Sequence, residues 1–293
     1  MPWRYALLLL GVCSSSLSVI LIRISPTNPV VLSALRLLVA SVLLAPICWR
    51  EWRRHRAAFT RQLWRRTLTP SVLLALHFSS WSYGARLTTA APASLIVNLV
   101  PIALPFFLGW LVHERINRRE VLGTAIALIG VTVLTARQAF AGGGDPRGNL
   151  ICFGAMLLVA WYVALGRRNR DFPSLWLYVG PIYLQAGLLC LALAAPWLGA
   201  FDAGSGEEWA LILALAVVPT ILGHTLLNYS VRHLRGQVVG LAYAAQFIFP
   251  TLLAYYLFHE RPAPQFYAGS VIVLAGIALV VFAAPTPLPP AAE

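Results

Sequence analysis

The chain has 293 residues, of which 59% are hydrophobic and only 11% charged, and its mean hydropathy is +0.75. Apolar runs near twenty residues long recur along it, which is the length that a helix needs to cross a hydrocarbon core of roughly 30 Å. The net charge of +12 raises the question of nucleic acid, but this charge gathers in short connections between apolar runs. The composition therefore indicates a membrane protein and makes a nucleic-acid partner the weaker interpretation.

Ten apolar stretches follow one another in chain order. They span residues 4–24, 30–49, 68–88, 91–112, 119–136, 149–166, 174–199, 209–230, 238–258 and 264–284. They lack the period-two alternation of a membrane β-barrel. The first could imitate a signal peptide, but it has no obvious cleavage site after it and we expect it to be retained. The sequence predicts an all-α polytopic membrane protein with ten transmembrane helices.

The sequence is duplicated. His113-Glu114-Arg115 returns as His259-Glu260-Arg261, 146 residues later. The same offset lays Tyr83 on Tyr229, Arg86 on Arg232, Gly123 on Gly269 and Gly130 on Gly276. A fixed period indicates a repeated architecture. Since each copy holds five predicted helices, an odd number, the second copy must enter the membrane in the opposite orientation, and the repeat is predicted to be inverted.

The boundaries follow from this period and from local composition. We expect a first five-helix repeat at 1–140 and a second at 149–284. The glycine-rich segment 141–148 would be an external linker, and the proline-rich residues 285–293 a disordered tail. Inverted repeats are a known architecture of secondary transporters, in which the substrate site lies near the midplane between the halves.

The basic residues predict the topology. All 22 are arginine, and seven of them lie between Arg50 and Arg66. With the N-terminus inside, sixteen arginines fall on the cytoplasmic side and five outside, as the positive-inside rule requires. We therefore expect a bacterial-type inner membrane protein with both termini cytoplasmic and with anionic lipids as neighbours of the basic loops.

Segment 83–136 resembles the EamA module of the drug/metabolite transporter superfamily. It shares an Ala/Ser-rich entry to the fourth helix, the proline Pro101 within that helix, a glutamate at its end, and two glycines in the fifth helix. Segment 229–282 repeats these marks, and Arg36 and Trp161 are residue types common at such positions. The first copy differs at Ser15, which stands where the offset would place a second tryptophan. The resemblance implies a carrier of amino acids, sugars, nucleotide sugars or other metabolites.

The acidic residues and cysteines argue against several chemistries. All ten acidic residues fall in loops, at predicted helix ends or in the tail, which disfavours proton antiport through a buried carboxylate. The four cysteines lack CxxC or Cys/His spacing, so we expect no disulfide framework, metal or cofactor. No catalytic residues are predicted, because a membrane enzyme acting on lipid phosphate would need an intramembrane or interfacial cluster of His, Asp or Glu.

Arg36 is the one charge deep in a predicted helix, and it has two interpretations. It can hold a substrate carboxylate or phosphate, or its long stem can carry the guanidinium outward to the membrane surface. His77 is a candidate for the pathway, although a single intramembrane histidine is more often a hydrogen-bonded packing residue.

Amides beside prolines form a second group of candidates. Asn98 precedes Pro101 and Pro105, and Gln246 precedes Pro250. A proline frees the carbonyl four residues earlier and kinks a helix, which is tolerated next to a cavity. The alternative for both amides is ordinary hydrogen bonding between helices.

Aromatic residues form a third group, with Trp81, Trp161, Tyr162 and Tyr243 as candidates for stacking on a substrate. Interfacial belts are the alternative for aromatic residues near helix ends. The His-Glu-Arg turns are interpreted as structural turns between two helices, in which the glutamate caps the following helix and pairs with the adjacent arginine.

These observations predict a secondary transporter, an exporter or exchanger of a small polar, amino-acid-like metabolite, that works by alternating access. Its expected partners are that small-molecule substrate and membrane lipids, with the protein a monomer or weak homodimer. The alternative is a flippase for a lipid-linked anionic headgroup, which would open sideways to lipid where a metabolite carrier opens to water.

Overall fold

The computed structural model describes residues 2–88, 93, 96–97, 99–140, 145–201, 205–246, 248–249 and 264–283. Within these ranges the chain is helical apart from short connections, and it contains no β-strand. Asn98, Pro250, the second His-Glu-Arg turn and the tail 285–293 lie outside the described residues. The all-α fold class is confirmed over the part that can be described.

The helices follow the predicted order. The first half contains α1 (Pro2–Ser16), α2 (Ser18–Ile24), α3 (Pro29–Arg54), α4 (Arg61–Arg66), α5 (Leu68–Leu87), α7 (Val100–Val112) and α8 (Arg118–Phe140). The second contains α9 (Pro146–Arg168), α10 (Leu175–Ala194), the 3₁₀ helix η1 (Ala195–Ala200), α11 (Gly206–Leu215), the π-helix η2 (Ala216–His224), α12 (Thr225–His233), α13 (Gly236–Tyr243) and α15 (Pro264–Ala283).

Six helical segments in the described ranges are long and apolar enough to cross a membrane. The chain is therefore a multi-pass membrane protein. The predicted stretches 91–112 and 238–258 fall partly outside the described residues, with α7 and α13 as their described parts. The count of ten helices consequently stays a prediction.

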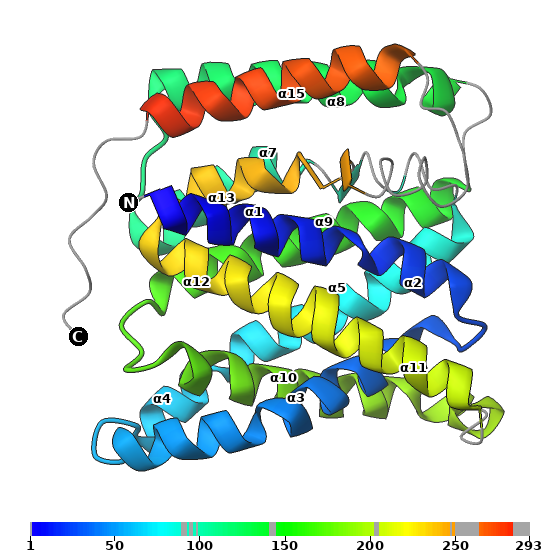
Figure 1. Cartoon of the computed structure of the whole chain (residues 1–293), viewed down its shortest axis with the longest axis vertical. Helices are drawn as coiled ribbons and strands as arrows, with labels where there is room; N and C mark the ends of the chain where they lie inside the picture. The colour runs from blue at the N-terminus through cyan, green and yellow to red at the C-terminus, as the bar shows by residue number, and fades with distance from the viewer. Residues whose placement is uncertain are drawn as a thin grey trace.

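Equivalent helices of the two halves pack against each other. α3 contacts α10 and α8 contacts α15, while α1 packs on η2 and α12 as α5 packs on α9. In Figure 1, α8 and α15 form one end of the molecule and α3 and α10 the other, with α1, α9 and α12 between them. Exchanging the halves leaves this set of contacts unchanged.

Glycines bring α8 and α15 into direct backbone contact. A Cβ built on Gly123 would lie 2.7 Å from the carbonyl oxygen of Gly276, and one on Gly130 would lie 2.8 Å from that of Gly269. Small residues allow such close approach in membranes. Because residue numbers rise on one helix as they fall on the other, the two equivalent helices run antiparallel.

The duplicated arginine binds backbone carbonyls near the end of the first helix in both halves. Arg86 of α5 donates to the carbonyls of Ile22 (3.2 Å) and Ser25 (2.7 Å), where the first helix of its half ends. Arg232 of α12 donates to the carbonyls of Arg170 (3.0 Å) and Phe172 (2.6 Å), beyond the end of α9. Arg86 thus satisfies carbonyls left free at a helix terminus, and Arg232 binds carbonyls of the turn that follows one.

The loops after these first helices are also held by charged side chains. Glu208 of α11 accepts a hydrogen bond of 2.9 Å from the Ser25 hydroxyl. In the loop after α9, Arg66 forms an ion pair of 2.7 Å with Asp171. The hydrogen bond from Arg66 lowers the pKa of the Asp171 carboxyl, so the pair is intact at neutral pH and is lost as the pH falls through that lowered pKa.

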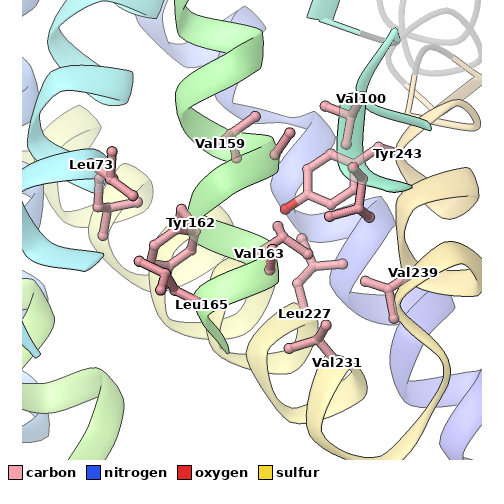
Figure 2. Close-up of a cluster of buried hydrophobic side chains, with 14 of the residues drawn as sticks. Leu73, Val100, Val159, Tyr162, Val163, Leu165, Leu227, Val231, Val239 and Tyr243 are labelled. Atoms are coloured by element: carbon pink, nitrogen blue, oxygen red, sulfur yellow. The ribbon is translucent and has the colours of Figure 1, made fainter. Parts of the chain in front are cut away.

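The hydrophobic core joins helices from both halves. Figure 2 shows Val159 and Val163 of α9 beside Val100 of α7 and Leu227 of α12. All four side chains are buried. The central packing therefore depends on both copies of the sequence, and neither half has this core alone.

The glycine contact yields a test. In Gly276→Ala the new Cβ would meet the Gly123 oxygen at 2.5 Å and the Ala127 nitrogen at 2.6 Å. Both are backbone atoms that cannot rotate away, so we expect the variant to lose about 1–3 kcal/mol of stability through overpacking. Thermal unfolding in detergent, followed by tryptophan fluorescence, measures the loss. Gly154→Ala is the control, because its Cβ would meet nothing within 4 Å; equal melting of the two variants would contradict the close contact.

Candidate functional site

A cavity lies between the two halves of the molecule. Five of the predicted site residues line it: Arg36, His77, Trp81, Tyr243 and Gln246. Ser15, Phe78 and His224 are further members of the lining. These residues come from α1, α3, α5, η2 and α13 with the turn that follows it, so the wall is assembled from both repeats.

Interruptions of helices surround this cavity. α1 ends at Ser16 and α2 begins at Ser18, and the hydroxyls of Ser15 and Ser16 donate to carbonyls of their own helix at 3.0 and 2.7 Å. Such bonds compete with regular helical geometry. On the other side α13 ends at Tyr243, and η2 is a π-helix. Broken helices around a central site are typical of secondary transporters.

Arg36 points into the protein. The residue is only 1% exposed, its Nε donates to the Thr220 hydroxyl at 3.0 Å, and its guanidinium carbon lies 4.3 Å from the centre of the Phe78 ring. A guanidinium reaching for the membrane surface would be exposed, so the outward orientation is wrong for this structure. Its Nη1 and Nη2 have no hydrogen-bond partner among the described residues.

Two histidines flank this cation. His77 shares a hydrogen bond of 2.8 Å with the Ala155 carbonyl through Nδ1, which must therefore carry the proton. The ring of His224 meets Phe78 edge-on at 4.9 Å, and its Nδ1 is unpartnered within the described ranges. No acidic side chain is among the described residues that line the cavity. The site is thus cationic, with neutral hydrogen-bonding groups around the charge.

Gln246 closes one side of the cavity. Its Nε2 donates to the Ser15 hydroxyl at 3.0 Å, which joins the second half to the first. The Tyr243 hydroxyl, from the preceding turn, is buried without a partner in the described part of the chain. Ser15 is the position where the duplicated pattern would place a tryptophan, and its small side chain leaves room for this contact.

Trp161 and Tyr162 do not line this cavity. Trp161 stacks on Phe107 with ring centroids 5.7 Å apart and borders a second hollow with Trp110, His113 and Arg168. Tyr162 is 1% exposed and accepts a hydrogen bond of 2.7 Å from Asn228. Figure 2 shows Tyr162 and Tyr243 on opposite sides of α9.

The predicted kink residues occupy two different positions. Pro101 lies in the first turn of α7, where a missing N–H leaves no bond unmade, and Pro105 lies inside that helix. Pro105 frees the carbonyl of Pro101, and Gln237 of α13 donates to that oxygen at 3.3 Å and to Thr124 at 2.8 Å. The exposed backbone group is therefore satisfied by the other half of the protein.

An ion-pair network surrounds the first His-Glu-Arg turn. Glu114 binds the guanidinium of Arg167 at 3.0 Å and accepts from the backbone N–H of Gly236 at 3.0 Å. Arg235 pairs with Glu120 at 2.6 Å and donates to the carbonyl of Arg115 at 2.9 Å. Every one of these contacts joins the first repeat to the second.

The proposed capping role of Glu114 is wrong. α8 is capped instead by Asn117 and Glu120, each of whose side chains accepts from the other's backbone N–H at 2.8 Å, the reciprocal arrangement of a capping box. Glu114 also pairs with Arg167 and not with the adjacent Arg115. In the sequence, Arg167 and Arg235 contribute only to the charge distribution that predicts the topology. They lie far along the chain from the His-Glu-Arg turn, so no local pattern predicts that they pair with its glutamate.

The fold and the cavity define a multi-pass membrane protein of the transporter class. The chain belongs to the EamA-like transporter family, which matches residues 2–136 and again residues 146–282. The double match confirms that the chain contains two copies of one module and confirms the resemblance found in the sequence. It is a membrane transporter.

Relatives with curated descriptions agree in class and are distant in sequence. An uncharacterized transporter of Archaeoglobus fulgidus is 24% identical, with 88% of this chain and 89% of the relative covered. The inner membrane protein YtfF of Escherichia coli is 23% identical, with 89% of each covered. A solved crystal structure aligns with a TM-score of 0.76 at 20% identity over 96% of each chain, which shows the shared fold.

The ion-pair network yields a test. Glu114→Ala would leave Arg167, whose side chain is 4% exposed, without its carboxylate. Loss of one partner of a buried pair costs about 3–5 kcal/mol, so we expect a clearly lower melting temperature in detergent. Glu207→Ala, which removes an exposed glutamate, should melt like the parent. A parent-like melting temperature for Glu114→Ala would show that the network does not hold the repeats together.

Proposed function

We propose that this protein is a secondary carrier that exports or exchanges a small polar, amino-acid-like metabolite by alternating access. The observation that carries the proposal is the buried guanidinium of Arg36, which lines a cavity between the repeats and has two nitrogens without a partner in the described chain. Burying an unpaired charge costs several kcal/mol. An anionic group of the substrate would supply the missing partner.

The remaining polar groups suit the other end of an amino acid. The side-chain oxygen of Gln246 can accept from an ammonium group, since its nitrogen is occupied by Ser15. The Tyr243 hydroxyl can do the same. Trp81 and Phe78 offer apolar faces to a side chain. Because the described lining residues include no carboxylate, a cation lacking an acidic group would meet the charge of Arg36 without a charged partner to offset it.

Alternating access requires two halves that can exchange conformations, and we propose that the repeats are inverted. The antiparallel contact between α8 and α15, which are equivalent helices, supports this orientation. The contacts between α3 and α10, and between α8 and α15, also support it, because they are unchanged when the two halves are exchanged. α1 begins and α15 ends on the same side of the molecule (Figure 1), which fits an even number of crossings.

The arginine distribution supports a cytoplasmic position for both termini in a bacterial-type inner membrane. The network of Glu114, Arg167 and Arg235 would then lie at the cytoplasmic end of the contact between repeats. In this conformation it closes that end, and opening toward the cytoplasm requires its bonds to break.

Transport by proteoliposomes tests the proposal. Vesicles containing the purified protein are loaded with a metabolite mixture that includes the twenty amino acids, and efflux is measured by mass spectrometry with and without a pH gradient. We expect the parent to release at least one amino acid or close relative, and Arg36→Ala to slow that release roughly tenfold or more, since a hydrogen bond to a charged group contributes about 1.5–3 kcal/mol.

Arg53→Ala is the matched control for this assay, because it removes an exposed arginine from the same helix. It should transport like the parent. Release of no metabolite, together with movement of a fluorescent anionic lipid between leaflets, would replace the carrier by the flippase alternative. Release that is unaffected by Arg36→Ala would remove the cavity charge from the mechanism.

A further inference from the structure

Thr220 stands opposite Arg36 across the contact between repeats and is fully buried. Its hydroxyl donates to the carbonyl of Leu215 at 2.8 Å, which fixes the direction of its only proton. The free lone pairs are left for Arg36, whose Nε donates to the same oxygen at 3.0 Å. Thr220 is therefore an oriented acceptor and cannot turn into a donor without losing the Leu215 bond.

The contact determines which part of the guanidinium remains available. Arg36 has five N–H groups, and the one on Nε is taken by Thr220. The other four belong to Nη1 and Nη2, which have no partner in the described chain. The Phe78 ring, 4.3 Å from the guanidinium carbon, limits rotation on one side. Arg36 lines the cavity and its two terminal nitrogens are left without a partner in the described chain, a fork that matches the two oxygens of a carboxylate.

The acceptor lies in an unusual segment. η2 is a π-helix that contains Pro219, and Tyr183 donates to the Thr220 carbonyl at 3.3 Å. Single π-helical turns occur frequently at functional sites because they move a side chain away from the position it would hold in a regular helix. Here Thr220 belongs to the second repeat and Arg36 to the first, so the orientation of the fork depends on both.

We propose that Thr220 is the positioning residue that makes Arg36 a two-pronged receptor for the carboxylate of the transported molecule. This inference rests on the proposed function and narrows its cargo to solutes with a free carboxylate. Amides and amines of the same skeleton are poor ligands, because they lack the two anionic oxygens of a carboxylate and the described lining residues include no acid to receive them. Thr220 acts through Arg36 and need not touch the substrate.

Binding measurements on the purified full-length protein in detergent test the inference. Acetate, propionate and L-alanine are each compared with the corresponding amide at constant ionic strength, and dissociation constants are obtained from ligand-dependent shifts in melting temperature. The parent should bind each carboxylate at least tenfold more tightly than its amide. Thr220→Val keeps the shape of the side chain but removes the acceptor, and should reduce this preference about tenfold.

Three further variants separate positioning from structural damage. Thr220→Ser restores a hydroxyl and should restore the preference to within about twofold of the parent. Tyr183→Phe removes the hydrogen bonds of that hydroxyl to the Thr220 carbonyl and to Thr225 but keeps the Thr220 hydroxyl, and should bind like the parent. Arg36→Lys keeps the charge but lacks the fork, so it should lose the preference even if Thr220→Val does not fold.

An unchanged preference in Thr220→Val or in Arg36→Lys would overturn the inference. So would a Thr220→Ser variant as impaired as Thr220→Val, because the hydroxyl would then not be responsible. The vesicle assay distinguishes the two proposals. Carboxylate-selective binding without transport of any solute would leave the receptor in place and remove the carrier function, whereas transport without carboxylate preference would remove only the receptor.

Discussion

The organisation of this protein depends on one cation placed where its two halves meet. Arg36 is buried, held at one nitrogen by Thr220 and at one face by Phe78, and lacks an acidic partner among the described residues. A charge taken out of water without a counterion is unfavourable by several kcal/mol. Other contacts in the fold have to offset that unfavourable free energy, and an anion bound beside the guanidinium would reduce it.

Those other contacts are made in pairs. Arg86 and Arg232 anchor the ends of the first helix in each half, and the glycines of α8 and α15 meet in a symmetric crossing. Similar contacts occur in both halves because the sequence is duplicated. The two copies also differ at the cavity, where the 146-residue offset lays Ser15 on Trp161 and Phe78 on His224.

Much of the architecture was predictable because apolar length, arginine placement and a 146-residue period are strong, additive signals. The site was predictable in part. Arg36, His77 and Gln246 stood out as polar groups in apolar helices and do line the cavity. Trp161 and Tyr162 do not, because α9 is apolar on most of its surface and periodicity could not show which face turns inward.

The sequence alone could not predict the contacts between the two repeats. Thr220 lies 184 residues from Arg36, and a hydroxyl in an apolar helix has many possible partners. Glu114 and Arg167 are 53 residues apart and each had a simpler local interpretation. Such pairs can be identified only in the packed structure, because each residue is also compatible with the local pattern of its own helix or loop.

The ion pairs at the first His-Glu-Arg turn also break the symmetry that the duplication creates. Offset by 146 residues, the positions of Arg167 and Arg235 are Leu21 and Thr89, neither of which can pair with a carboxylate. Two identical halves would give two conformations of equal free energy. Here the ion pairs of Glu114 with Arg167 and Arg235 have no counterpart at the offset positions, so the two halves of the chain are not interchangeable at their contact.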